Sequence, residues 1–390
     1  MGMERTVSTI ALDSFEVSPD RGFLPADDPI FTFGEEADKD LRELESLGAQ
    51  IPELLQSHKL RESVRRIKLI RPDIFRHLDR RTLLMAIRIY AFLASAYVHQ
   101  IDEPKVKHIP KNVAVALYDL SKKAGRRFPI LSYDLYALNN WRRIDPTGPI
   151  NVENLDTIQK FVKIRDEPWF ILIHVEIEAK ASRAIRAIGN LQQAVLRHDT
   201  DSLKLALDTI VESLGSMIDT LRRMPEGNSP DVYAFAFRPY IQMFQGITYE
   251  GVKELPPMPT FRGETGAQSS IIPSLDVALG VKHAKTDLTD YVADMRNYMP
   301  KKHREFIEAV EENEGAHPLR TYLMKRGRGG IVDSYNTCLE RVMEFRQKHL
   351  EFAVSYIQSK VTDPSGTGGT PFMKWLGQLR DEADAHKIPN

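Results

Sequence analysis

The stretch LLMAIRIYAFLASAYV, at residues 83–98, is the most apolar run in the 390-residue chain. A single charged residue, Arg88, interrupts it. The run is shorter than the roughly 20 apolar residues that a membrane-spanning helix needs. It therefore predicts a helix buried in the core of a globular protein.

Apolar residues recur at helical spacing beyond this run. Leu41, Leu44 and Leu47 lie three residues apart, and Ile51 and Leu54 continue the pattern. Convincing apolar–polar alternation and Asn-Gly turns, which mark strands and hairpins, are absent from the sequence. We therefore predict an all-α fold. Helices are expected from residue 38 onward and over 83–98, 112–124, 157–164, 169–197, 201–224, 230–244, 271–282, 287–297, 300–313, 317–326, 329–360 and 371–385.

Two irregular segments divide the chain. Residues 1–35 are rich in Pro, Asp and Phe without periodicity, and we expect an irregular arm that lies over the fold. The segment WRRIDPTGPINVENL, at 141–155, contains two prolines and a glycine, so it is the expected connection between two parts. We expect a small N-terminal domain over 1–155 and a large helical domain over 156–390.

Composition limits the partners and the compartment. The formal net charge is −1, which gives no reason to expect nucleic acid or an anionic membrane as a partner. The single cysteine, Cys338, excludes an internal disulfide, and the N-terminus lacks the basic and apolar regions of a secretory signal. We expect a cytoplasmic monomer.

Several familiar motifs are missing. The patterns HEXXH, CXXC and Gly-X-Ser-X-Gly do not occur, so zinc-protease, zinc-ribbon and hydrolase functions have no support. The stretch GTGGTPFMKW, at 366–375, is rich in glycine, but a phosphate-binding loop needs a preceding strand and a following Gly-Lys-Ser/Thr. A linker or a mobile lid over a pocket remains.

Two histidines are candidates for chemistry. His303 lies about one turn into a predicted helix after Pro300, and the residues alone predict a solvated histidine at a basic helix start. His174 shares a helical face with Phe170 and Glu178 in an apolar run, which predicts a buried, neutral imidazole. A core histidine bonded to Glu178 or to a carbonyl satisfies that pattern.

Arg238 is a permanent charge in aromatic company, beside Tyr233, Phe237 and Tyr240. The nearest acid in the sequence is Asp231, about two helical turns away. A buried guanidinium needs an anion, and arginine can grip a carboxylate with two hydrogen bonds. Stacking on an aromatic ring is the other explanation, and both remain open.

Taken together, the motifs resemble the indoleamine 2,3-dioxygenase family of haem enzymes. The resemblance is clearest in FRGETGAQSSIIPSLDVALGV (261–281), DMRNYMPKKHREF (294–306) and GTGGTPFM (366–373). IPKNVAVALYDLSKK (109–123), FPILSYDLYALNNW (128–141) and DPTGPINVENLD (145–156) support it. It extends from about Phe15 to Asp381.

The resemblance implies a cofactor, haem b (iron protoporphyrin IX), which is ferrous in the active state, with O₂ as co-substrate. His303 matches the family's proximal iron ligand, in place of the solvated role that its surroundings suggest. Asp276 is implied to steer the proximal side, and Arg296 or Arg304 to lie near the haem propionates.

The resemblance also implies a substrate site for L-tryptophan or a related indole. Arg238 matches the residue that holds the tryptophan carboxylate, Phe170 packs on the indole and Tyr133 lines the pocket. Gly266 approaches the substrate's amino group. The GTGGT stretch matches a lid over about 361–371, with Thr367 as the contact to the polar end of the substrate.

Three features depart from the family pattern. His174 stands where mammalian members have a small hydroxyl residue, so it could act on the distal side by bonding O₂ or the indole N–H. An alignment shifted by a few residues would place Leu172 there instead. Tyr136 replaces a smaller residue, and Tyr233 with Ala234 replaces a phenylalanine pair.

The expected reaction inserts both atoms of O₂ across the indole C2–C3 bond of L-tryptophan and gives N-formylkynurenine, which enters kynurenine metabolism. Two alternatives stay open. One is a haem enzyme of the same fold that acts on another indole, and the other is an O₂-binding haem protein without turnover.

Overall fold

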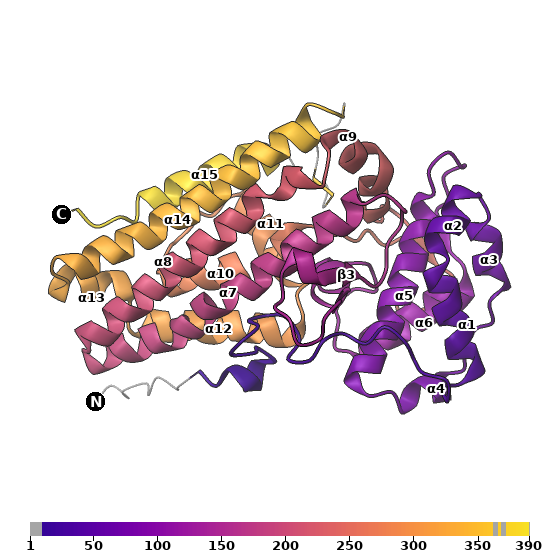
Figure 1. Cartoon of the computed structure of the whole chain (residues 1–390), viewed down its shortest axis with the longest axis horizontal. Helices are drawn as coiled ribbons and strands as arrows, with labels where there is room; N and C mark the ends of the chain where they lie inside the picture. Colours follow the sequence, from indigo (N-terminus) through magenta and orange to yellow (C-terminus); the bar gives the residue numbers. More distant parts are fainter. Residues whose placement is uncertain (1–9, 362–365, 368–371, 390) are drawn as a thin grey trace.

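α-Helices build the fold, as predicted (Figure 1). The computed structural model describes residues 10–361, 366–367 and 372–389. In this part of the chain, strands form two short pairings. β1 (His108–Ile109) pairs in parallel with β4 (Thr248–Tyr249), and β2 (Trp141–Arg143) pairs antiparallel with β3 (Leu155–Thr157). The all-α prediction is confirmed.

The first group of helices gathers at one end of the molecule, around the apolar run 83–98 (Figure 1). It comprises α1 (Lys39–Ala49), α2 (Ile51–Gln56), α3 (Leu60–Arg66), α4 (Pro72–Arg76), α5 (Arg80–His99) and α6 (Lys111–Lys123). α5 contacts α1, α3 and α6, and residues 85–98 are all buried. By length and composition α5 is the one described helix that could cross a membrane, yet 83% of its apolar window is buried inside the protein.

Arg88 has a structural explanation within this apolar helix. Its guanidinium is 1% exposed and donates from Nη2 to the Ile30 carbonyl at 3.1 Å and from Nη1 to the Asn139 carbonyl. The arginine thereby joins α5 to the N-terminal arm and to the π-helical turn η2 (Asp134–Leu138). A buried guanidinium that donates to two main-chain carbonyls holds three distant segments together.

The second group of helices forms the larger part of the molecule. It comprises α7 (Asp166–Arg197), α8 (Thr200–Arg222), α9 (Pro230–Val232), α10 (Ile271–Ala278), α11 (Asp287–Arg296), α12 (Lys301–Ala316), α13 (Leu319–Arg326), α14 (Gly330–Ala353) and α15 (Phe372–Asp384). α7 packs along α8, α8 along α14, and α14 along α15 (Figure 1). α10 links α7 to α12.

The described part of the N-terminal arm, from residue 10, lies over this second group, as expected. Gly22 has φ +61°, and a Cβ there would stand 3.2 Å from the Ser182 Cα on α7, so only glycine fits the turn and the close approach. Phe23 then packs against His303 and Phe306 on α12, with ring centroids 4.8 and 5.6 Å away. The arm therefore covers α7 and α12 together.

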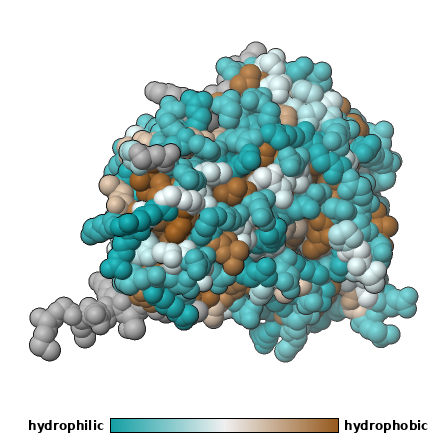
Figure 2. All heavy atoms as spheres, turned by 60° about the vertical axis from the view of Figure 1, so that its left-hand side comes forward, coloured by the Kyte–Doolittle hydropathy of each residue, from teal (hydrophilic) through white to brown (hydrophobic). Residues whose placement is uncertain are grey.

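The surface is mostly hydrophilic on the face drawn in Figure 2, with apolar side chains in small, separated groups. Among the described residues, exposed large apolar side chains include Phe31, Ile144, Leu205, Phe235 and Met324. Scattered apolar residues of this kind are normal on folded proteins.

The helix predicted over 157–164 is wrong. β3 ends at Thr157 and an irregular loop runs to α7. The buried Glu167 carboxylate accepts hydrogen bonds from the main-chain N–H groups of Phe161 and Val162, both at 2.8 Å. A side chain therefore satisfies the donors that a helix would have satisfied, and periodicity could not reveal it.

The helix predicted over 230–244 is also wrong as a continuous α-helix. α9 contains three residues and passes into the π-helical turn η5 (Tyr233–Phe237) and the 3₁₀ turn η6 (Arg238–Ile241). Pro239 has no N–H group to continue an α-helix, and its ring disfavours α geometry at the residue before it. Similarly, the predicted helix 329–360 is α14 followed by a π-helical turn, η8 (Val354–Gln358).

Replacing Glu167 with Ala is expected to lower the free energy of unfolding by roughly 2–5 kcal/mol, because two buried N–H groups lose their acceptor. Glu167→Gln, which keeps one acceptor oxygen, should cost less. Denaturant unfolding followed by circular dichroism measures both. The exposed Glu312→Ala is the control and should change stability by less than about 0.5 kcal/mol. Equal stability of Glu167→Ala and the parent protein would contradict this role.

Candidate active site

Arg238 is buried beside an aromatic cluster, as predicted. Its side chain is 5% exposed and follows the turn η5, so the guanidinium reaches the hydroxyl of Tyr233. The Phe170 ring of α7 lies 5.2 Å from the Tyr233 ring and 5.7 Å from the Phe237 ring. A permanent cation thus stands next to flat aromatic surfaces, which suits a ligand with a carboxylate and an aromatic ring.

His174 lies one turn beyond Phe170 on the same face of α7, with the two rings 4.6 Å apart. Its Nδ1 is 2.7 Å from the Phe170 carbonyl oxygen. A carbonyl only accepts, so Nδ1 carries the hydrogen and Nε2 presents a lone pair. Burial lowers the pKa of His174, so the ring is neutral. The prediction of a core histidine bonded to a carbonyl is confirmed. The Nε2 atom remains an acceptor that a ligand can use.

His349 on α14 is a neighbour that the sequence did not point to. Its pKa is lowered to about 4, first by burial and then by the nearness of His174. The His349 side chain nevertheless keeps accessible surface, and so do His174 and Phe170. The electrostatic effect of His174 on His349 places these two histidines, from α7 and α14, close to each other.

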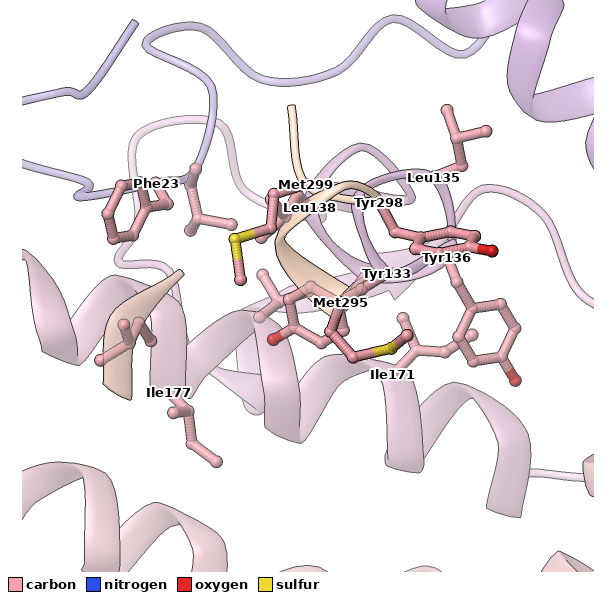
Figure 3. Close-up of a cluster of buried hydrophobic side chains, with 14 of the residues drawn as sticks. Phe23, Tyr133, Leu135, Tyr136, Leu138, Ile171, Ile177, Met295, Tyr298 and Met299 are labelled. Atoms are coloured by element: carbon pink, nitrogen blue, oxygen red, sulfur yellow. The ribbon is translucent and has the colours of Figure 1, made fainter. Parts of the chain in front are cut away.

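Tyr133 and Tyr136 come from the turn η2 and face α7 (Figure 3). The Tyr133 hydroxyl donates to the Glu178 carboxylate at 3.0 Å, and the Tyr136 hydroxyl donates to Glu167 at 3.3 Å. The Ser269 hydroxyl also donates to Glu178, at 2.8 Å. Both tyrosines are therefore held by buried carboxyl groups, and burial raises the pKa of Glu178 to about 7 and of Glu167 to about 8.

The loop 261–270 connects the segments that carry the predicted substrate residues. Gly263 packs so closely on the main chain after Arg238 that a Cβ would stand 2.3 Å from the Ile241 oxygen. The Glu264 N–H donates to that same oxygen at 3.1 Å. Gln268 accepts from the Tyr133 N–H at 2.9 Å and donates to the Gly263 carbonyl at 2.8 Å. The loop thus ties η6 to η2.

Thr367 attaches to the same loop. Its hydroxyl, 6% exposed, donates to the main-chain oxygen of Glu264. The lid expected over 361–371 lies mostly outside the described residues, which include 361, 366 and 367 of that range. Gly266 is exposed at the start of the 3₁₀ turn η7 (Gly266–Gln268), with open space where a Cβ would be.

The side chain of Glu264 is the feature of this loop that sequence reasoning missed. It is 4% exposed, and burial raises its pKa to about 8. The carboxyl acts electrostatically on the hydroxyls of Tyr133, Tyr136 and Tyr233, so it lies within reach of all three. The signal was present: Glu264 is the one acid in FRGETGAQSS, between glycines in a loop.

His303 lies in the first turn of α12 and is 5% exposed, so the prediction of a solvated histidine is wrong. The covering residue is Phe23 of the arm, which is distant in sequence. Burial lowers the pKa of His303 to about 3, which keeps the imidazole neutral. Its Nδ1 is buried without a hydrogen-bond partner among the residues that the structure describes.

Asp276 belongs to a buried charge cluster. It accepts from Arg346 of α14 at 2.5 Å and lies 3.4 Å from His283, which in turn contacts Glu382 of α15 at 2.6 Å. These opposite charges hold the pKa of Asp276 below its usual value despite burial. The cluster joins α10, α14 and α15.

The two arginines expected near the propionates lie at the start of α12 and just before it. Arg296 reaches Glu311 at 3.4 Å, and Arg304 donates to the Arg296 carbonyl at 3.5 Å. They are neighbours of each other and of His303 in the chain, so the structure brings these three predicted residues to one region.

Glu264→Gln is expected to stabilise the haem-free protein at pH 8. The folded-state pKa of Glu264, about 8, lies above its ordinary value of 4.5, so the folded chain retains a proton that the unfolded chain loses as the pH rises. The free energy of unfolding therefore decreases as the pH rises from 4.5 to about 8. The amide variant avoids that loss, which is roughly 3–5 kcal/mol.

Thermal unfolding of parent and variant at pH 5 and pH 8 measures this effect. The variant should gain clearly at pH 8 and little at pH 5. A gain of the same size at both pH values would contradict a buried, ionisable Glu264.

Comparisons with known proteins agree with this geometry. The family model described as indoleamine 2,3-dioxygenase matches residues 11–386. Rat indoleamine 2,3-dioxygenase 1 is 33% identical over 356 residues, which cover 85% of this chain and 86% of the rat protein. The Saccharomyces cerevisiae indoleamine 2,3-dioxygenase is 26% identical over 434 residues and covers 96% of this chain and 93% of its own. The chain therefore belongs to the indoleamine 2,3-dioxygenase family, whose members are haem-dependent oxidoreductases that act on indoles.

Proposed function

We propose that this protein is a haem dioxygenase that inserts both oxygen atoms of O₂ across the indole C2–C3 bond of L-tryptophan and releases N-formylkynurenine. The observation that carries the proposal is the buried Arg238 guanidinium beside the rings of Phe170, Tyr233 and Phe237. One permanent cation at the edge of aromatic surfaces complements a carboxylate attached to an indole. An O₂ carrier needs no such group.

The resemblance assigns His303 as the axial ligand to the haem iron. The imidazole is neutral and covered by Phe23, and its ring bonds the Glu16 main chain, while its Nδ1 has no partner among the described residues. A neutral imidazole nitrogen is the form that binds iron. Arg296 and Arg304, close by in the chain, are the candidates to face the propionates. When bound, ferrous haem b supplies the O₂ chemistry.

The chain's own contribution is positioning. Arg238 holds the substrate carboxylate, and Phe170 with Tyr233 sets the plane of the indole. His174 presents Nε2 as an acceptor, so it suits the indole N–H better than it suits bound O₂, which needs a donor. Tyr133 and Tyr136 close the pocket against α7 and are fixed by Glu178 and Glu167.

Another indole remains the second candidate, since Tyr136 and Tyr233 change the shape and polarity of the pocket. Both side chains are buried and their hydroxyls contact charged groups, so they occupy fixed volumes. Comparing the turnover of L-tryptophan, D-tryptophan and ring-substituted tryptophans decides between the two. The expected result is a preference for L-tryptophan.

Turnover by reduced, haem-loaded protein in air is expected to convert L-tryptophan to formylkynurenine, detected by absorbance and mass spectrometry. Arg238→Leu should lower kcat/KM by roughly 30- to 1,000-fold, because a buried charge-assisted carboxylate contact is lost. The haem spectrum should be unchanged. Arg238→Lys is the control for charge alone and should recover part of the loss.

Full activity of Arg238→Leu would remove this residue from the site. Absence of any product from properly ferrous, haem-loaded parent protein would reject L-tryptophan as the substrate.

His303→Ala is expected to abolish stable haem loading or to change the haem spectrum to that of a protein without an imidazole ligand. Adding free imidazole should restore part of the parent spectrum, because the side-chain volume is vacated. His99→Ala is the control, since it removes another neutral histidine whose pKa burial lowers, at a position outside the candidate site, and it should load haem. Normal haem spectra for His303→Ala would overturn the ligand assignment.

A further inference from the structure

The carboxyl group of Glu264 is buried, and none of the roles assigned above uses it. Its main chain is fixed on both sides, by the Ile241 oxygen and by the Thr367 hydroxyl. The position of its side chain is therefore determined by the same loop that joins Arg238, Tyr133 and Thr367.

Two other buried carboxyl groups nearby accept hydrogen bonds from protein donors. Glu167 accepts from two main-chain N–H groups and from Tyr136. Glu178 accepts from Tyr133 and Ser269. By contrast, no side-chain or main-chain group of the described residues donates a hydrogen bond to the Glu264 carboxyl. A buried carboxyl group that no described donor reaches costs stability, and a bound ligand with N–H donors would offset that cost.

The charge environment indicates what kind of partner this is. Tyr233 contacts the Arg238 guanidinium and also lies within electrostatic reach of Glu264, so a carboxyl group and a cation flank one pocket residue. Burial alone shifts the pKa of Glu264, which means that Arg238 does not neutralise it directly. A carboxyl group and a guanidinium that lie near one tyrosine, with no ion pair between the two of them, suit a ligand that carries both an ammonium and a carboxylate.

We propose that Glu264 binds the ammonium group of the substrate, so that Arg238 and Glu264 hold the two charges of a zwitterionic α-amino acid. This inference rests on the proposed function and deepens it, because it names the substrate class as indole amino acids with a free ammonium group. Glu264 is then a specificity-determining residue that discriminates against indole acids without an amine. An ammonium also supplies the donors that the carboxyl lacks within the protein.

The test compares three ligands with haem-loaded protein kept oxidised and free of reductant, so that binding is measured without turnover. L-Tryptophan carries both charges, tryptamine carries the ammonium alone, and indole-3-propionate carries the carboxylate alone. Dissociation constants come from the change in haem absorption and, independently, from calorimetry. Each ligand is titrated into parent protein, Glu264→Gln and Arg238→Leu.

Glu264→Gln is expected to weaken L-tryptophan and tryptamine by roughly 10- to 100-fold and to leave indole-3-propionate within about threefold. Arg238→Leu should show the complementary pattern, with tryptamine spared. Glu178→Gln is the matched control: it changes a buried carboxyl group of the same region that already accepts from Tyr133 and Ser269, so it should not separate the ligands by their ammonium group. Glu264→Asp, which keeps the charge but withdraws it by about one bond length, should bind L-tryptophan with intermediate affinity and provides a second variant.

Equal weakening of all three ligands by Glu264→Gln would overturn the proposal. The Glu264 side chain would then act on the indole ring, which all three ligands share, and not on the ammonium group. Unchanged binding of all three would overturn it too. These outcomes are separate from failure of the proposed function. If haem-loaded parent protein neither binds nor oxidises L-tryptophan, the function fails; if the parent oxidises it and Glu264→Gln treats the ligands alike, only this inference fails.

Discussion

The close contact between Gly263 and the Ile241 oxygen is the constraint on which the site depends. No side chain fits at Gly263, so the loop 261–270 can lie directly on the main chain that follows Arg238. The Glu264 N–H then bonds the same oxygen, and Gln268 extends the connection to Tyr133. One glycine thereby fixes the relative positions of a guanidinium, a carboxyl group and a tyrosine from three separate segments. Backbone-to-backbone contact of this kind is more rigid than contact between long side chains.

Three buried carboxyl groups lie in this region, and burying each of them costs free energy. Glu167, Glu178 and Glu264 all have pKa values raised by burial, to about 8, 7 and 8. The first two are satisfied by protein donors and stabilise a loop and two tyrosines. No described residue donates to the Glu264 carboxyl, so its burial lowers the stability of the folded protein. Active sites commonly retain such strain because the ligand relieves it.

Local sequence patterns predicted much of the fold. α5, α7, α8, α12 and α14 follow directly from apolar periodicity, and α5 is buried as its composition requires. The errors share one cause, which is that distant groups overrode local preference. Glu167 bonds the loop at 161–162 in place of a helix, and Pro239 divides the segment around Arg238 into π- and 3₁₀-helical turns.

The site was predictable to a different degree for each residue. Arg238 stood out because a permanent charge among aromatic residues needs an anion, and the structure places it as expected. His303 seemed solvated from its neighbours, because the residue that covers it, Phe23, is 280 positions earlier in the chain; the resemblance alone pointed to it. Glu264 and His349 were missed, since their significance comes from burial and from neighbours on other segments.

The most direct test of the account is a crystal structure of the haem-loaded protein with L-tryptophan. The account predicts that the iron is bound by His303, that the substrate carboxylate lies on Arg238 and that its ammonium lies within hydrogen-bond distance of the Glu264 carboxyl. An iron held by a different side chain, or an ammonium group directed away from Glu264, would contradict it.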